Sequence, residues 1–143
     1  MTELDLLAGA LAAEHAAIFA YGPIGARLAG AAGIQAARAA EEAHRTRRDE
    51  LVRALAERGA PAPAVEPGYQ LPFPLTGPED AERLAVLVEE RVGAVWRAVL
   101  PAVTGTDRAR ALTALVDAAV RATGWRLAAG VAPATVPFPG ASG

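Results

Sequence analysis

Hydrophobic residues recur at steps of three and four along most of this chain, which is the spacing of one face of an α-helix. In the first stretch they are Leu4, Leu7, Leu11, Ile18 and Tyr21. Three later stretches repeat the pattern, and alanine, the strongest helix former, is the most frequent residue of the chain. The pattern therefore predicts four amphipathic helices over residues 2–28, 34–58, 79–103 and 107–129.

Capping residues and helix breakers indicate where these helices end. Thr2 is predicted to cap the first helix, whose first turn carries two acidic residues. Pro78 favours the first turn of the third helix, and Gly59 and Gly130 follow the second and fourth helices, where glycine commonly ends a helix. Pro23 is expected to kink the first helix.

The connection between the second and third predicted helices has a different composition. Residues 59–78 include six prolines and three glycines, which do not form a helix. A connection of this length can cross a helical bundle from one end to the other. The tail, residues 131–143, is also rich in proline. Pro72-Phe73-Pro74 and Pro137-Phe138-Pro139 are each predicted to be an extended segment whose phenylalanine covers one end of the bundle.

Composition narrows the range of functions. The chain of 143 residues is 52% hydrophobic and 21% charged with a net charge of −2, so we expect one helical domain and no nucleic-acid partner. It has no cysteine, which excludes disulfides, thiolate metal sites and cysteine nucleophiles. Glu3 and Asp5 lie where a signal peptide needs positive charge, and the charge-free stretch 16–26 is too short to span a bilayer. We therefore expect a cytoplasmic protein without a membrane partner.

Charged residues interrupt the apolar faces of the first two predicted helices. Glu14 lies three residues after Leu11 and four before Ile18, so helix geometry directs its carboxylate into the core. On the second helix, Glu41 and His44 are three residues apart. Side chains at this spacing project together and can offer a carboxylate oxygen and an imidazole nitrogen to one ion.

A constant shift in sequence number relates the two halves of the chain. It takes Glu14 to Glu89 and Tyr21 to Trp96, which suggests an internal duplication. The same shift brings neither a glutamate nor a histidine to the fourth helix, where Asp117 is the only acid beyond the first turn.

With these residues the chain resembles the ferritin-like carboxylate-bridged di-metal bundles, whose ligands are a glutamate and a Glu-x-x-His pair in each half. Over nearly its whole length it is similar to small bacterial ferritin-like domain proteins with no assigned function. The resemblance implies an all-α, ferritin-like four-helix bundle with a long crossover between helices 2 and 3. The motifs that carry it are Ala12-Ala13-Glu14-His15, Phe19-Ala20-Tyr21-Gly22, Ala40-Glu41-Glu42-Ala43-His44-Arg45, Glu89-Glu90-Arg91 and Pro137-Phe138-Pro139-Gly140.

Several hypotheses of function remain open. One is a degenerate ferritin-like domain that acts as a binding or structural module, in which the inward polar residues form a buried cluster or hold one Mn, Fe or Zn ion. Its metal ligands would be Glu14, Glu41, His44 and Glu89, with Arg48 and Tyr21 beside them. Another is an enzyme, a di-metal oxidase or oxygen-detoxifying protein whose second metal position is completed by Asp117 or by a partner chain. A third is a protein that binds a partner helix in a groove.

Other residues receive simpler interpretations. His15 is expected to flank the apolar face and to be partly exposed, and Trp96 and Trp125 are interpreted as core or interface anchors. The small residues Gly22, Gly25 and Ala29 permit close helix contact. They motivate a homodimer hypothesis, with packing inside the bundle as the alternative.

Overall fold

The computed structural model describes residues 1–141, and it consists of four long helices. They are followed or joined by irregular segments and one short 3-10 helix, η1, and the described residues contain no strand. The prediction of four helices is therefore confirmed, and the protein is all-α. The elements are α1 (Glu3–Arg27), α2 (Ala31–Glu57), α3 (Pro78–Val99), η1 (Leu100–Ala102) and α4 (Gly105–Ala129).

The helix ends follow the local chemistry of the sequence. At the start of α1, the Thr2 hydroxyl accepts a hydrogen bond from the Asp5 amide at 3.1 Å, and the Asp5 carboxylate accepts one from the Thr2 amide at 2.8 Å. This capping box satisfies two amide groups that a helix start leaves without partners. α4 ends at Gly130, whose φ of 69° is the left-handed conformation that glycine adopts freely. Pro23 lies inside α1, which continues to Arg27.

α2 begins earlier than the pattern predicts, at Ala31 rather than at residue 34. Gly30, with a φ of 84°, makes the turn after α1, and the alanines that follow it are good helix formers. α3 ends at Val99 rather than at 103 because the chain tightens into η1 around Pro101, which has no amide hydrogen to continue the helix.

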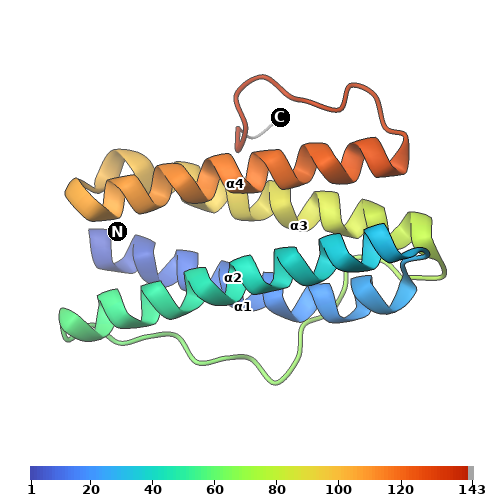
Figure 1. The fold of residues 1–143 in the computed structure, drawn as a ribbon. Helices are drawn as coiled ribbons and strands as arrows, with labels where there is room; N and C mark the ends of the chain where they lie inside the picture. Colours follow the sequence, from blue (N-terminus) through green and yellow to red (C-terminus); the bar gives the residue numbers. More distant parts are fainter. Residues whose placement is uncertain (142–143) are drawn as a thin grey trace.

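The four helices lie side by side, with α1 in contact with α2 and α3, and α3 in contact with α4. Figure 1 shows that α1 and α2 run in opposite directions, as do α3 and α4. The segment 58–77 contains neither helix nor strand and runs along the outside of the helices, so that α3 starts near the end where α2 started. α2 and α3 therefore run in the same direction.

Large apolar side chains from α1, α2 and α3 form most of the core, whereas α4 contributes mainly alanine. Because alanine is small, α4 lies close to α3. A Cβ built on Gly93 would be 3.9 Å from the Ala118 Cβ. The fully buried side chains of the first three helices include Leu7, Leu11, Ile24, Leu51, Leu55, Leu84 and Trp96, and the buried alanines of α4 are Ala111, Ala114, Ala118 and Ala122.

The two Pro-Phe-Pro segments have different surroundings. Phe73 is half-buried against the core, and the Arg83 guanidinium lies 4.8 Å from the centre of its ring. Phe138, in contrast, is 74% exposed. The prediction that Phe138 covers an end of the bundle is wrong, because the tail is fixed through its backbone: Arg97 donates hydrogen bonds to the carbonyl oxygens of Phe138 and Pro139, both at 3.1 Å.

The small residues near the end of α1 lie at the surface. Gly22 and Ala29 are exposed, and a Cβ built on Gly22 or Gly25 would have no atom of a neighbouring helix within 4 Å. They are therefore not used for close packing between the helices of one chain, and the homodimer remains a prediction.

α1 is long and apolar enough to cross a membrane, with a mean hydropathy of 1.3 over 18 residues, and among the described residues no other helix meets this test. The criterion considers length and composition alone. Core helices of soluble proteins and signal sequences near an N-terminus also meet it. In this structure, the inner face of α1 contributes Leu7, Leu11 and Ile24 to the core.

Candidate functional site

A group of polar side chains is buried between the helices, and we refer to it as the polar layer. All four helices contribute to it. Its three central members, Glu14, His44 and Glu89, are each only 1% exposed. Burial of charged groups in a core is costly unless they are paired and hydrogen-bonded. The polar layer consists of Glu14, Tyr21, His44, Glu89, Trp96, Arg121 and Trp125.

His44 lies at the centre of the polar layer and bridges two carboxylates. Its Nδ1 is 2.5 Å from Glu14 Oε2, and its Nε2 is 2.9 Å from Glu89 Oε1. Burial alone lowers the pKa of His44, but the hydrogen bonds and negative charges of Glu14 and Glu89 outweigh it and raise the pKa to about 9. At neutral pH the ring is therefore an imidazolium that donates a hydrogen bond from each nitrogen.

Aromatic side chains of α1 and α3 also donate hydrogen bonds to these two carboxylates, each to the glutamate of the other helix. Trp96 on α3 donates from Nε1 to Glu14 on α1 at 2.8 Å, and Tyr21 on α1 donates its hydroxyl to Glu89 on α3 at 2.6 Å. The shift in sequence number relates the two glutamates to each other and the two aromatic residues to each other. In the structure, the glutamate of each half accepts a hydrogen bond from the aromatic residue of the other half.

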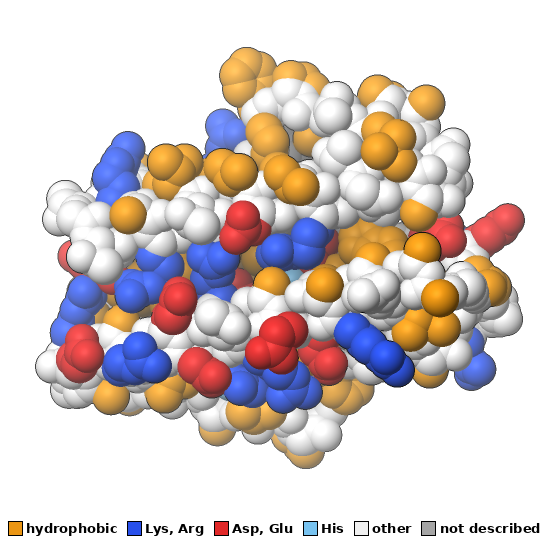
Figure 2. Space-filling view, viewed as in Figure 1, with side chains coloured by type: hydrophobic (Ala, Val, Ile, Leu, Met, Phe, Trp, Pro, Cys, Tyr) orange, Lys and Arg blue, Asp and Glu red, His pale blue; other side chains and the backbone are white. Residues whose placement is uncertain are grey.

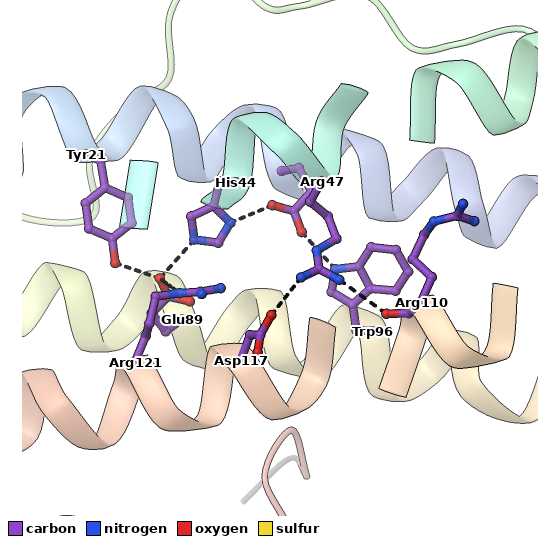
Figure 3. Close-up of polar contacts among 9 residues, drawn as sticks. Tyr21, His44, Arg47, Glu89, Trp96, Arg110, Asp117 and Arg121 are labelled. Carbon is purple, nitrogen blue, oxygen red and sulfur yellow. Dashed lines mark hydrogen bonds and ion pairs between the residues drawn. The ribbon is translucent and has the colours of Figure 1, made fainter. Parts of the chain in front are cut away.

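Two residues of α4 complete the polar layer. Arg121 donates from Nε to Glu89 Oε1 at 3.0 Å (Figure 3). Trp125 donates from Nε1 to the Tyr21 hydroxyl at 3.0 Å. Burial raises the pKa of Tyr21 well above its ordinary value, and the negative charge of Glu89 adds to this effect, so Tyr21 is a neutral donor. The negative charges of Glu14 and Glu89 are balanced by the positive charges of His44 and Arg121.

The two oxygens of Glu89 differ in their surroundings. Oε1 accepts hydrogen bonds from Tyr21, His44 and Arg121, whereas Oε2 is buried and has no hydrogen-bond partner within residues 1–141. Burial by itself raises the pKa of Glu89, but the hydrogen bond and charge of His44, with Arg121 and Tyr21, lower it below its ordinary value. Glu89 is therefore ionised, with one saturated oxygen and one free oxygen.

The structure brings together three of the four predicted metal ligands, Glu14, His44 and Glu89, but not Glu41. The Glu41 side chain is 33% exposed and pairs with Arg45 at 3.3 Å on the surface of α2. Residues three apart on a helix differ in direction by about 60°, and α2 turns His44 inward, which leaves Glu41 at the edge. The expectation that Glu41 shares an ion with His44 does not fit this placement.

Of the predicted neighbours of the site, Tyr21 is in the polar layer and Arg48 is not. The Arg48 Nε donates to Asp49 at 2.9 Å on the surface of α2. The arginine that contacts a carboxylate of the layer is Arg121 instead. Arg121 was missed because an arginine on a helix of mixed polarity is ordinarily solvated, and nothing in its sequence position distinguishes it from the other arginines of α4.

Asp117 also lies outside the polar layer. Its side chain is 42% exposed and pairs with Arg47 at 2.9 Å, and Arg47 donates in addition to the Arg110 carbonyl at 3.3 Å (Figure 3). The hypothesis that Asp117 completes a second metal position does not fit this pairing.

His15 is buried, with 7% exposed, so the expectation that it is partly exposed is wrong. Burial lowers the pKa of His15, and the nearby positive charge of Arg48 lowers it further, against the opposing effect of Glu14. Trp96 and Trp125 are buried, as their interpretation as core anchors predicts, and both also donate to the polar layer.

The donors and acceptors of the polar layer are paired with one another in this structure. A histidine ligand needs a neutral ring with a free lone pair on one nitrogen, whereas both nitrogens of His44 face carboxylates. A cation already lies between Glu14 and Glu89, namely the His44 imidazolium. Within residues 1–141, no group of three or more His, Asp or Glu side chains has an arrangement that could hold an ion.

Comparison with known proteins identifies relatives without describing their activity. The family model described as "Domain of unknown function (DUF4439)" matches residues 7–143. The crystal structure of a conserved hypothetical protein, rv2844, from Mycobacterium tuberculosis is 41% identical in sequence, with a TM-score of 0.84. The match covers 88% of this chain and 96% of that one. No curated protein matches this sequence.

Proposed function

The chain belongs to the DUF4439 family, and we propose that it is a ferritin-like binding or structural module in which hydrogen-bonded ion pairs replace a metal centre. Three features support the ferritin-like assignment: the parallel α2 and α3, the long segment 58–77 between them, and glutamates that project inward from α1 and α3.

The bridge formed by His44 carries this proposal. An ion placed between Glu14 and Glu89 has to displace the imidazolium, remove a proton from a group whose pKa is about 9, and break two hydrogen bonds. Trp96 and Arg121 each hold one of the carboxylates in its present orientation. Within residues 1–141, hydrogen bonds and ion pairs thus engage both carboxylates, and no contact there favours the di-metal enzyme.

Elemental analysis tests the proposal directly. Protein purified without a chelator is expected to contain far less than one equivalent of Mn, Fe or Zn, and its melting temperature is expected to be the same with and without EDTA. The same result is expected after reconstitution with each ion. One equivalent that is lost with destabilisation on chelation would contradict the proposal, and two equivalents of iron would support the enzyme instead.

A pair of variants gives this experiment an internal control. Glu41→Leu is expected to leave stability nearly unchanged, because the Glu41–Arg45 pair is at the surface and such pairs contribute about 0–1 kcal/mol. His44→Leu leaves two buried carboxylates without their shared cation, and removal of one partner from a buried ion pair costs about 3–5 kcal/mol. Equal effects of the two substitutions would indicate that Glu41 and His44 act together, as they would at a metal.

A further inference from the structure

The outward side of α4 carries large apolar side chains along most of its length. Leu112, Val116, Val120 and Leu127 lie within about 80° of one another around the helix axis. Each of them is between 50% and 66% exposed. Figure 2 shows a row of apolar side chains along α4 and others on the tail beside it. An exposed apolar row of this kind marks an interaction surface rather than an ordinary solvated helix.

The charged residues of α4 do not interrupt this row. Beyond the first turn of the helix they are Arg110, Asp117, Arg121 and Arg126, and each of them forms an ion pair with a residue of α2 or α3. Their side chains therefore lie at the two flanks of α4. The outward side is completed by small or uncharged residues, namely Ala109, Thr113, Thr123, Gly124 and Ala128.

The C-terminal tail extends the row on the side of α3. Val136 lies with Val116 and Val120 around one cavity between α4 and the tail, and Phe138 is 74% exposed. Arg97 fixes this part of the tail through two of its carbonyl oxygens. We use the term apolar face for the six large residues of α4 and the tail, Leu112, Val116, Val120, Leu127, Val136 and Phe138.

The area of the apolar face matches what a stable dimer needs. The exposed parts of its six residues amount to about 600 Å². A standard interface between proteins buries about 800 Å² on each partner, of which about 60%, or roughly 500 Å², is apolar. The apolar face is therefore large enough for one complete interface.

The order of large and small residues along α4 is complementary to itself. Leu112 is near the start of the helix, and the small residues Gly124 and Ala128 are near its end. Leu127 is near the end, and Ala109 is near the start. When two copies of α4 pack in opposite directions, each leucine of one copy therefore faces small residues of the other, and the valines meet at the centre. A parallel pair would instead place leucine against leucine.

We propose that the chain forms a twofold homodimer through the apolar face, with the two α4 helices antiparallel. Such a contact uses the same residues on both copies, as a twofold axis requires. The tail lies along the second half of α4, so Val136 and Phe138 reach the first half of α4 of the second copy, near its Leu112 (Figure 1). This face is distinct from the small residues of α1, and it is independent of the polar layer.

The molar mass of the full-length protein in solution, measured by light scattering, tests the dimer. At about 100 µM the unaltered chain is expected to show twice its mass of 14.6 kDa. Val120→Glu places two unpaired charges at the centre of the contact and is expected to show the mass of one chain. Val52→Glu is the control, because Val52 is an exposed valine of α2 outside the apolar face, and it should remain dimeric.

Two results of this experiment would overturn the proposal. If the unaltered protein has the mass of one chain, the apolar face is not a contact between copies and a different partner covers it. If the dimer persists in Val120→Glu, or if Val52→Glu dissociates it equally, the contact lies elsewhere on the molecule.

Cysteine cross-linking locates the contact without adding charge, since the chain has no cysteine of its own. In Val120→Cys the two thiols lie near the twofold axis, and a short bifunctional thiol reagent is expected to join the copies. Val52→Cys should give no joined product. In Leu112→Cys the antiparallel arrangement separates the two thiols by about 18 Å or more, so the same reagent should not join them. Absence of a product from Val120→Cys, or efficient joining in Leu112→Cys, would contradict the proposed contact.

Discussion

At the scale of single residues, the distinctive group is a histidine with a carboxylate on each ring nitrogen. An isolated buried carboxylate is strongly disfavoured, and two facing carboxylates more so, unless a cation lies between them. In this chain the cation is the His44 imidazolium, at 2.5 Å from Glu14 and 2.9 Å from Glu89. The proton on His44 thus balances the charge of the two carboxylates, as a metal ion does in a metal centre. Loss of this proton at alkaline pH is expected to lower the stability of the folded protein.

The stability of the protein is expected to fall as the pH rises from about 6.5 to 9. The pKa of His44 is raised from 6.5 to about 9 in the folded chain. Its contribution is therefore complete below pH 6.5 and is lost as the pH rises through 9, a change of about 3 kcal/mol in the free energy of unfolding. The pKa of Glu89 is lowered, so the contribution of Glu89 is complete above its ordinary value and stays constant in this range.

Urea unfolding at a series of pH values measures this change, and the second histidine provides the control. The slope between pH 6.5 and 9 is expected to vanish in His44→Gln and to persist in His15→Gln. The pKa of His15 is lowered, so its effect has the opposite sign and is confined to pH values below about 6.5. A slope that survives in His44→Gln would show that another group is responsible.

At the scale of the helices, the sequence predicts most of the fold because apolar spacing and capping chemistry are local. It also identifies Glu14 and His44 as inward-facing residues, since each continues an apolar face. It does not determine which member of the Glu41–His44 pair faces the core, because the two directions differ by only about 60° and neighbouring helices decide between them. Arg121 is unpredictable for the same reason: its role depends on a carboxylate from α3.

The two threonines that precede helices allow a test of this local chemistry. Thr2 makes a side-chain cap on α1, whereas Thr104 precedes α4 without one. Thr2→Ala is expected to lower the free energy of unfolding by about 1 kcal/mol, and Thr104→Ala to change it by much less. Thermal or urea unfolding of the two variants provides the measurement. A larger loss in Thr104→Ala would mean that the capping box of α1 contributes little to stability.

At the scale of the whole molecule, two helical halves are joined through their cores. The halves exchange hydrogen bonds between Glu14 and Trp96 and between Glu89 and Tyr21, so each glutamate has a donor from the other half in addition to one from its own. The tail adds a layer on α3 and α4 only, where the alanines of α4 leave space beneath it. Hydrogen bonds from Arg97 and Arg126 attach the tail to the helices. We therefore expect that the tail can detach locally while the helices stay folded.

Arg97→Ala is expected to release the tail without unfolding the helices. Arg97 holds the carbonyl oxygens of Phe138 and Pro139, and the Ala141 amide donates to the same Phe138 carbonyl at 3.1 Å. Hydrogen exchange at Ala141 should become faster, while the free energy of unfolding changes by less than about 1 kcal/mol, since no apolar core residue is altered. Arg91→Ala, an exposed arginine of the same helix, is the control and should change neither. Unchanged exchange in Arg97→Ala would mean that the contact between Arg126 and Ala134 is sufficient to hold the tail on α3 and α4.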